Sequence, residues 1–336
     1  MKPVSIIVPC YNEEAHIGHL LEALLHQTYP TEAMEIIIAD GLSTDRTREV
    51  IDRFCQQHPE LTIKVVDNPK RIIPAALNVA LGAASGVYVV RLDAHSVPAP
   101  DYIERCVADL EADLGDNVGG VWIIRPSATH WIAHSIALAA GHPLGVGDAR
   151  YRVGHQAGLV DTVPFGAFRR DLFERVGRFD EQLLTNEDYE FNARLRDMGG
   201  RVYLDPHIRC EYFARPTLRA LARQYWRYGF WKFRMLTRYP HTLRWRQALP
   251  PLFVLGLAGL ALAAPFRVEA RLLWVWSIGL YLIALLLGAL PVAWRTKEVR
   301  HLIGLPLAIA IMHFAWGSGF LWSMIKTLLR RDRTSG

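Results

Sequence analysis

Three long stretches without a charged residue constrain most strongly how this chain can fold. They lie in its last third, at residues 247–266, 272–294 and 302–325. Each is long enough to cross the hydrocarbon core of a bilayer as a helix. The chain before Arg246 has the composition of an ordinary globular domain. The sequence therefore predicts a water-soluble head at residues 1–214 and a transmembrane region at 247–327.

Basic and aromatic side chains alternate in the segment that joins these parts, residues 215–246. Examples are Arg223, Tyr225, Trp226 and Arg227. Such a segment can stack on single-stranded nucleic acid, or it can lie in the headgroup region of a membrane. Because three apolar stretches follow directly, we interpret it as membrane-interface helices and expect no nucleic-acid partner.

The topology of the membrane region stays open. Three spans with a cytoplasmic head would put the basic tail, residues 328–336, outside the cell, against the positive-inside tendency. Pro306, Gly317 and Gly319 would alternatively let the last stretch fold back as a re-entrant pair.

The location of the head is predicted from its first residues and its cysteines. No apolar leader precedes the first strand, and the four cysteines form no C-x-x-C pair. We expect a multi-pass protein of a bacterial inner membrane whose head faces the reducing cytoplasm.

The head shows alternating strand and helix patterns. Period-2 and continuous apolar runs predict strands at 4–8, 35–39, 62–66 and 86–90, and apolar residues at helical spacing predict helices at 14–27, 44–57 and 73–84. This order predicts an α/β fold with a mostly parallel sheet and helices on both faces.

Polar residues follow three of these strands. Those after the first strand include Tyr11 and Glu13. Asp93 and His95 come after the strand at 86–90, where both side chains can reach one divalent cation at the ligand-binding edge of the sheet. Asp40 closes the second strand and either accepts hydrogen bonds from a nucleoside or belongs to a structural turn. Ser43 or Thr44 is predicted to cap the helix that follows.

Two patterns in the second half of the head also suggest chemistry. Glu187 and Asp188 begin an amphipathic helix, where they either complement the helix dipole or supply a general base. Gln224 and Arg227 lie three residues apart on a helix, and Arg227 offers a forked donor to a diphosphate. The apolar stretch at 131–144, with its histidines, is interpreted as a lid or membrane-facing helix rather than an acceptor surface.

The order of these motifs resembles that of the family-2 inverting glycosyltransferases with a GT-A fold. The segments are PCYNE, ADGLSTD, LDAH, NED and QYWRY, followed by membrane spans, and the resemblance covers residues 1 to about 235. The stretches RLDAH, VDTVPFGAFRR and NEDY look like the ExoA-type enzymes of bacterial exopolysaccharide assembly.

The resemblance implies roles for individual residues. Asp93 and His95 match the metal motif, with His95 in the place where the family usually has Asp, so that Mg²⁺ or Mn²⁺ stays open. Asp188, beside Glu187, matches the catalytic base. The matches to nucleotide-sugar-binding positions are Pro9, Tyr11, Glu13, Asp40, Arg71, Asp93, Gln224 and Arg227. The last motif ends in Tyr228, and His207 does not align clearly with a metal-binding histidine of the relatives.

By this resemblance, the chain moves one sugar, typically glucose from UDP-glucose, onto a hydroxyl of a polyprenyl-diphosphate-linked oligosaccharide. A single displacement would invert the anomeric carbon. The alternatives are a polyprenyl-phosphate sugar synthase, whose ionised acceptor needs no base, a processive polysaccharide synthase, which generally has more spans, and a catalytically silent nucleotide-binding membrane protein. The oligomeric state stays open.

Overall fold

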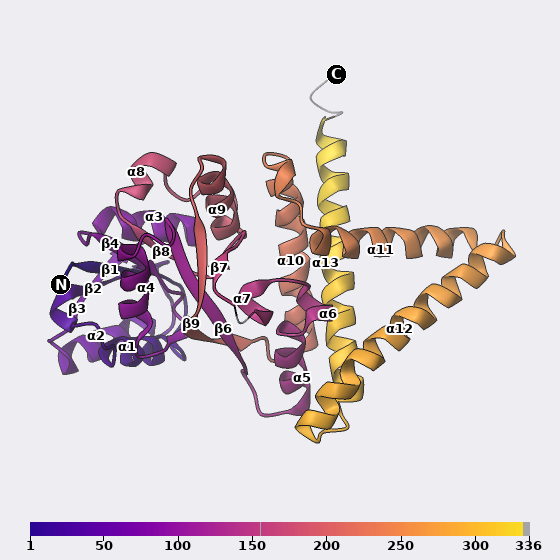
Figure 1. The fold of residues 1–336 in the computed structure, drawn as a ribbon, viewed down its shortest axis with the longest axis horizontal. Helices are drawn as coiled ribbons and strands as arrows, with labels where there is room; N and C mark the ends of the chain where they lie inside the picture. The colour runs from indigo at the N-terminus through magenta and orange to yellow at the C-terminus, as the bar shows by residue number, and fades with distance from the viewer. Residues whose placement is uncertain (155, 332–336) are drawn as a thin grey trace. The chain divides into compact units, whose positions relative to one another are not determined.

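The computed structural model describes residues 1–154 and 156–331 and divides the chain into two compact units (Figure 1). The first unit contains residues 1–123 and 154–212, and the second contains residues 124–153 and 213–336. Residues 124–153, which the sequence analysis assigned to the head, pack with the second unit. Of the predicted basic tail, residues 332–336 lie outside the described residues.

Four parallel strands form one half of the sheet in the first unit. They are β1 (Val4–Cys10), β2 (Met34–Asp40), β3 (Thr62–Asp67) and β4 (Tyr88–Arg91), in the spatial order β3-β2-β1-β4. Each is one of the predicted strands, with its ends shifted by one or two residues. The predicted α/β fold class is confirmed.

The other half of the sheet is antiparallel, which the sequence analysis did not foresee. Next to β4 the order continues through β8 (Ala167–Arg169), β6 (Asn117–Pro126), β9 (Val202–Ala214) and β5 (Val97–Pro98), and β7 (Gly158–Leu159) pairs with β9. The pairs β4–β8, β6–β8, β5–β9 and β7–β9 all run antiparallel. The helix and strand pattern used for the prediction ended near residue 90, so it carried no information on these later strands.

The helices of the first unit cover both faces of the sheet. Along the chain they are α1 (Ile17–Leu25), the short η1 (Thr31–Ala33), α2 (Thr47–Gln57), α3 (Ile73–Ala83), α4 (Tyr102–Glu111), α8 (Leu172–Val176) and α9 (Glu187–Asp197). Helix α3 packs against β1 and β2, on the face opposite α1 and α2, because the chain reverses its direction across the sheet after β3.

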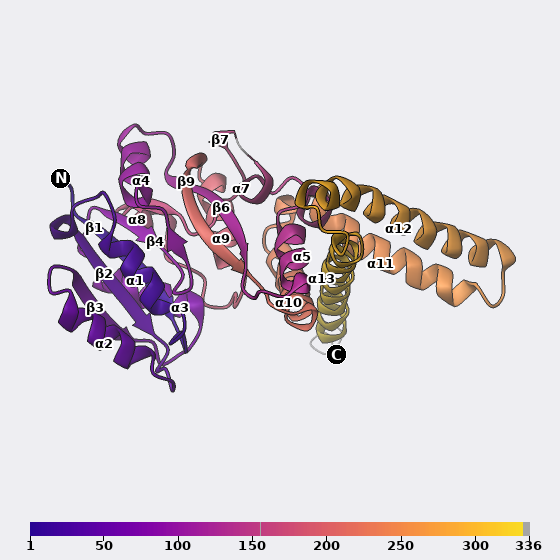
Figure 2. The same cartoon turned by 90° about the horizontal axis from the view of Figure 1, so that it is seen from below.

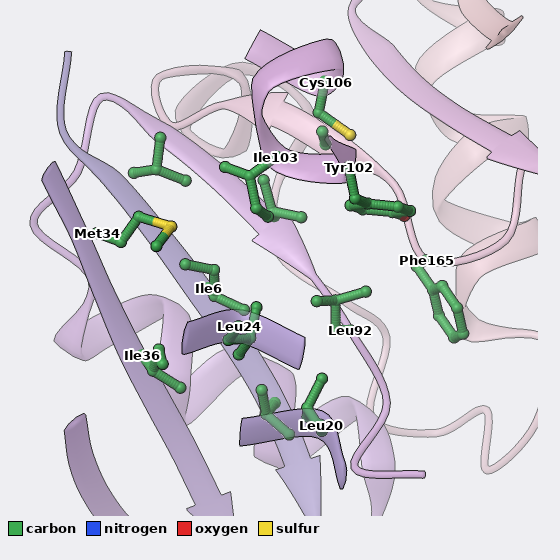
Figure 3. Packing of buried hydrophobic residues seen from close by; sticks show 14 of the residues in the cluster. Ile6, Leu20, Leu24, Met34, Ile36, Leu92, Tyr102, Ile103, Cys106 and Phe165 are labelled. Carbon is green, nitrogen blue, oxygen red and sulfur yellow. The ribbon is translucent and has the colours of Figure 1, made fainter. Parts of the chain in front are cut away.

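One hydrophobic cluster joins α1, α2 and α4 to the sheet. Ile6 and Ile36 from the strands meet Leu20 and Leu24 from α1 and Ile103 from α4 (Figure 3). All five side chains are fully buried, and each contributes about 1.5–3 kcal/mol to folding. This cluster fixes the positions of the strands, and the loops of the candidate site described below start at the carboxyl ends of these strands.

Within the described residues, the regular structure of the second unit is helical apart from the ends of β6 and β9. It contains α5 (Trp131–Ala140), α6 (Pro143–Val146), α7 (Arg150–Val153), α10 (Leu218–Leu236), η2 (Pro240–Thr242), α11 (Trp245–Ala263), α12 (Val268–Thr296) and α13 (His301–Arg331). Among the described residues, three helices are long and apolar enough to cross a membrane, namely α11, α12 and residues 301–329 of α13. Helix α13 is continuous, so the re-entrant fold at Pro306, Gly317 and Gly319 is wrong.

Glycines bring α10 and α13 into backbone contact. A β-carbon on Gly229 of α10 would lie 2.1 Å from the carbonyl oxygen of Trp316, and one on Gly319 of α13 would lie 2.1 Å from that of Trp226. Real β-carbons do not approach a backbone oxygen so closely, so only glycine permits this pairing. The two helices pack along each other at this point.

We predict that Gly319→Ala destabilises the second unit. The added methyl group forces the two backbones apart, and such overpacking costs about 1–3 kcal/mol. Thermal unfolding of the purified protein in detergent measures the loss as a lower Tm. Gly279→Ala on α12 is the matched control, since nothing lies within 4 Å of its β-carbon position. An equal Tm for both variants would contradict the packing described.

Candidate active site

The carboxyl ends of the parallel strands bring three loops to one edge of the sheet. Cys10 at the end of β1 is in register with Asp40 at the end of β2, and Ile7 of β1 is in register with Arg91 of β4. The loops at 11–16, 41–47 and 92–96 therefore start side by side. Ligands of open α/β sheets bind at this edge.

A carboxylate from the first loop contacts the histidine of the DAH motif. The Nδ1 atom of His95 lies 3.0 Å from Oε1 of Glu13, and the Nδ1 atom of His16 lies 3.2 Å from Oε2 of the same carboxylate. The hydroxyl of Thr47 accepts from the Glu13 backbone N–H at 2.8 Å. A proton on Nδ1 that is donated to Glu13 makes Nε2 the nitrogen of His95 with the lone pair.

The first two loops are tied together by polar contacts. Asn12 adopts a left-handed backbone conformation with φ 54°, its N–H donates to the Ser43 hydroxyl at 2.8 Å, and its side-chain oxygen accepts from the N–H of Thr44 at 2.8 Å. The prediction that Ser43 or Thr44 caps the next helix is wrong. Helix α2 begins at Thr47, whose N–H donates to the Asp45 carboxylate at 3.0 Å.

Asp40 is fully buried at the end of β2. Its carboxylate accepts from the Ser43 hydroxyl at 2.5 Å, from the Ser43 N–H at 3.0 Å and from Arg48 Nε at 2.6 Å. Arg48 also donates to Asp67, which ends β3, at 2.5 Å. A carboxylate has room for about four hydrogen bonds, so these partners orient Asp40 and leave little of it for a ligand.

Tyr11 and Arg71 form an exposed pair near the same edge. The guanidinium carbon of Arg71 lies 5.8 Å from the centre of the Tyr11 ring, a distance at which cation and ring attract each other. The ring packs on Gly41, where a β-carbon would lie 3.0 Å from it, and 43% of Tyr11 is exposed. Pro9 is buried within β1, beside Ala39 of β2.

A buried arginine joins the DAH motif to the acidic pair. The Nη2 atom of Arg91 donates to Asp93 Oδ1 at 3.2 Å and to Glu187 Oε1 at 2.9 Å. The side chains of Arg91 and Glu187 are only 5% and 7% exposed, whereas that of Asp93 is 25% exposed. The structure thereby brings together two motifs that are more than 90 residues apart in the sequence.

Helix α9 holds the acidic pair at its first turn. Asn186, just before the helix, has φ 70°, which turns the chain sharply into Glu187. Further along the helix, Asn192 accepts from Asn117 of β6 at 2.6 Å and donates to Thr162 at 2.9 Å. These buried hydrogen bonds fix the position of α9 against the sheet.

Charges in this cluster shift one another's protonation. Burial raises the pKa of Asp188 and of Glu187, and the positive charge of Arg91 opposes the rise. Burial also disfavours the charged form of Arg91, but Asp93, Glu187 and Asp188 outweigh it and raise the pKa of the guanidinium. A carboxylate whose pKa is raised is a stronger proton acceptor than an exposed one.

The donor set suits a metal ion that is completed by a ligand. Among the described residues, no three His, Cys, Asp or Glu side chains gather to hold a metal on their own. Asp93 and His95 offer one carboxylate and one imidazole, both partly exposed. Mg²⁺ and Mn²⁺ commonly bind one or two protein ligands and take the rest from phosphate and water. The residues therefore fit a metal–diphosphate complex.

Gln224 and Arg227 lie on α10, in the second unit. Gln224 donates to the Tyr228 hydroxyl at 2.9 Å, which holds two residues of the QYWRY motif together. Arg227 is exposed. His207 lies on β9 and has its Nδ1 atom 2.8 Å from Asp205.

Sequence reasoning missed Arg91 and Arg48 as parts of the site. Arg91 carried a visible signal, because it is a charged residue in a strand that is otherwise apolar and fully buried. A buried charge requires a partner, and the acidic pair at 187–188 was available. Arg48 gave no comparable signal, since it lies among other polar residues on an amphipathic helix.

Known proteins resemble this chain over nearly its whole length. The succinoglycan biosynthesis protein ExoA of Rhizobium meliloti (strain 1021) is 33% identical over 331 residues, which cover 97% of this chain and 96% of that protein. The dolichyl N-acetyl-alpha-D-glucosaminyl phosphate 3-beta-D-2,3-diacetamido-2,3-dideoxy-beta-D-glucuronosyltransferase of Methanococcus voltae is 28% identical, over 97% of this chain and 98% of that protein.

A solved structure shares the fold. The mannosyltransferase PcManGT from Pyrobaculum calidifontis, determined in complex with GDP-Man and Mn2+, superposes with a TM-score of 0.67 at 24% identity, covering 96% of this chain and 87% of that one. Residues 5–177, which contain the loops at 11–16, 41–47 and 92–96, match the family described as Glycosyl transferase family 2. The chain belongs to this family and is a glycosyltransferase.

Proposed function

We propose that the protein is an inverting, metal-assisted glycosyltransferase that adds one sugar to a hydroxyl of a polyprenyl-diphosphate-linked oligosaccharide in exopolysaccharide synthesis. The observation that carries the proposal is the charge cluster of Arg91, Asp93 and Glu187, with Asp188 beside it. It unites a residue suited to hold a metal–diphosphate with a carboxylate suited to take a proton. A nucleotide-binding protein without turnover has no use for a carboxylate that takes a proton.

The relatives support the acceptor class. The Rhizobium protein is named for the biosynthesis of succinoglycan, and the Methanococcus enzyme for transfer to a sugar on dolichyl phosphate. The second name indicates a lipid-linked acceptor, and the three apolar helices of this chain fit such an acceptor. We propose glucose from UDP-glucose as the donor, following the resemblance to ExoA-type enzymes.

The exposed pair of Tyr11 and Arg71 is suited to the nucleotide. The Tyr11 ring offers a flat apolar face to the base, and the guanidinium of Arg71 above it offers donors to ribose or phosphate oxygens. Asp40 shapes the same edge through Ser43 and Arg48 and has about one lone-pair position left for the base. Pro9 lies in the adjoining strand β1, and we retain Gln224 and Arg227 as proposed diphosphate contacts.

Asp93 and His95 are the residues that would hold Mg²⁺ or Mn²⁺. When bound, the metal supplies positive charge to the leaving diphosphate. Glu13 positions His95 by accepting a hydrogen bond from Nδ1–H, which leaves the lone pair on Nε2 to bind the metal. Asp93 has one oxygen engaged by Arg91, and this contact orients the carboxylate.

Asp188 is the proposed general base. Its raised pKa matches it to the removal of a proton from an acceptor hydroxyl as the oxygen attacks the anomeric carbon. The new C–O bond forms on the face opposite the breaking bond to the diphosphate, so a single displacement inverts the configuration. Glu187 stays paired with Arg91 and holds the first turn of α9 in place.

We predict that Asp188→Asn abolishes sugar transfer but not donor binding. The amide cannot accept the hydroxyl proton, and loss of a general base lowers turnover by about 100- to 10,000-fold. Purified protein is incubated with UDP-glucose, Mg²⁺ or Mn²⁺ and a lipid extract, and UDP release and the glycolipid product are measured. Asp197→Asn, at the other end of α9, is the control.

Equal transfer by wild type and Asp188→Asn would remove the base from the mechanism and favour a phosphate acceptor, which is already ionised. Donor binding by the wild type without turnover, after other nucleotide sugars have been tried, would favour a silent binding protein.

We predict that Glu13→Ala weakens the binding of Mn²⁺ in the presence of UDP by about 10- to 100-fold, the usual effect of losing a carboxylate that orients a ligand histidine. Glu13→Gln should fall between this variant and the wild type, because its amide oxygen still accepts from Nδ1. The EPR signal of free Mn²⁺ measures the binding without turnover. Glu14→Ala is the control, because that carboxylate bonds Arg46 instead. Unchanged affinity in Glu13→Ala would refute the role.

We predict that Arg91→Met lowers the free energy of unfolding by about 3–5 kcal/mol, since it leaves buried carboxylates without their counter-charge. The double variant Arg91→Met/Glu187→Gln should recover part of this loss, because it removes one of the unpaired charges. Denaturant unfolding of the wild type, Arg91→Met, Glu187→Gln and the double variant gives the coupling energy as a double-mutant cycle. Strictly additive losses would show that the two side chains do not interact.

A further inference from the structure

We propose that only the hairpin of α11 and α12 crosses the bilayer, and that α13 lies along the membrane surface with one apolar face on the lipid. All three helices qualify as spans by length and composition. Within the second unit they differ in how much of their surface is buried and in which helices cover them, and this difference is the basis of the proposal. The occupant of the exposed face of α13 is the interfacial region of the bilayer.

Exposure separates the hairpin from α13. In the apolar window of each helix, 17% of α11 and 11% of α12 is buried, compared with 44% of α13. The exposed large apolar residues of α12 point in many directions around the helix; neighbours such as Leu272, Leu273, Val275 and Trp276 are all more than half exposed. A helix that is apolar all round and open on most sides requires lipid on most sides.

Helix α13 instead exposes a single stripe. Its exposed large apolar residues follow helical spacing along one face: Ile303, Leu307, Phe314, Trp322, Ile325, Leu328 and Leu329. Leu305, Ala308, Ile309 and Met312, which point elsewhere, are fully buried. One apolar stripe on an otherwise covered helix is the pattern of a helix lying in the membrane interface.

Other helices of the second unit cover the rest of α13, and α11 and α12 also contact it. Helices α10 and α5 pack along it, and the Ser135 hydroxyl of α5 lies 2.8 Å from Nδ1 of His301. Helix α10 carries Arg219, Arg223 and Arg227 at four-residue spacing, all exposed. No hydrogen bond or ion pair involves these three arginines within the described residues.

These arginines exclude a spanning position for α13. Arg234 follows Arg219 by 15 positions on α10, so the four arginines extend over roughly 22 Å of helix. If α13 crossed the bilayer with α10 packed along it, several guanidinium groups would lie at hydrocarbon depth without partners. Charged side chains in that position are costly and rare.

The direction of the hairpin agrees with this assignment. In both views α11 and α12 leave α13 on the same side and meet at a tip away from it (Figures 1 and 2). The 19 residues of α11 reach about 28 Å, close to the hydrocarbon thickness of about 30 Å. Helix α12, with 29 residues, crosses the same layer at a tilt.

Charge at the two ends of the hairpin supports the same orientation. The open end carries Arg244, Arg246, Arg295, Lys297 and Arg300, whereas Arg267 and Arg271 lie near the tip. The positive-inside tendency places the open end in the cytoplasm. Two spans return α13 and its basic end to the side of the head, which removes the conflict that three spans create.

Nitroxide depth measurements test the position of α13. The full chain, with a spin label at Leu307→Cys, Phe314→Cys or Ile325→Cys, is reconstituted into phosphatidylethanolamine–phosphatidylglycerol vesicles, and accessibility to oxygen and to a polar nickel chelate gives the depth. We expect three similar, shallow depths. Leu273→Cys, Leu280→Cys and Leu287→Cys on α12 are the control and should run from shallow to deep to shallow. A graded series on α13 would overturn the proposal.

Sidedness gives an independent test. An impermeant maleimide is applied to sealed vesicles containing Glu60→Cys in the head, Arg267→Cys at the tip or Lys326→Cys on α13, each in a Cys55→Ser background because the other cysteines are buried. We expect positions 60 and 326 to react from the same side and position 267 from the other. Reaction of 326 together with 267 would establish a third span. Both readouts are independent of the proposed chemistry.

Discussion

The buried guanidinium of Arg91 is the interaction on which the candidate site depends. It stands at the end of β4, where Asp93 and His95 begin the metal-type motif, and its second partner is the first residue of α9. A charge in this position needs carboxylates to remain buried, and carboxylates in this position need the arginine. The pairing therefore helps to fix where α9 meets the sheet and keeps Asp188 close to Arg91 and Asp93. The proposed metal ligand Asp93 and the helix that carries the proposed base therefore share one buried charge, in addition to the hydrogen bonds of Asn192 that hold α9 against the sheet.

The parallel half of the fold could be predicted from the sequence because its strands are short, continuous and separated by clearly periodic helices. The antiparallel half could not, since strands such as β8 and β5 have only three and two residues and depend on tertiary pairing. Within the site, Asp93, His95, Asp188 and Glu13 were identified by motif. The contact of Glu13 with His95 spans 82 residues and left no local signal. The capping role assigned to Ser43 or Thr44 failed because both hydroxyls bond to the neighbouring loops instead.

In the membrane region, the sequence defined three apolar helices but did not distinguish those that cross the bilayer from those that pack on protein. Hydropathy counts apolar residues and does not record which of them face protein. Packing supplies that information through Gly229 and Gly319, which bring α10 against α13, so that the arginines of α10 restrict where α13 can lie. The side of the membrane on which the basic end of α13 lies then follows from connectivity. An even number of spans returns this end to the side of the head.

The proposed membrane geometry also gives a physical role to the position of the QYWRY motif. Gln224 and Arg227 lie on α10, which rests on α13, and α13 in turn rests on lipid. Arg227 is exposed, and in the proposed geometry its forked donor lies near the headgroup layer, where the diphosphate of the nucleotide sugar would meet a lipid-linked acceptor. A lipid-linked substrate diffuses in two dimensions and reaches only groups at that depth. The helix that carries the motif is fixed by its glycine contact with α13, so the proposed membrane position of α13 also determines the depth at which Gln224 and Arg227 lie.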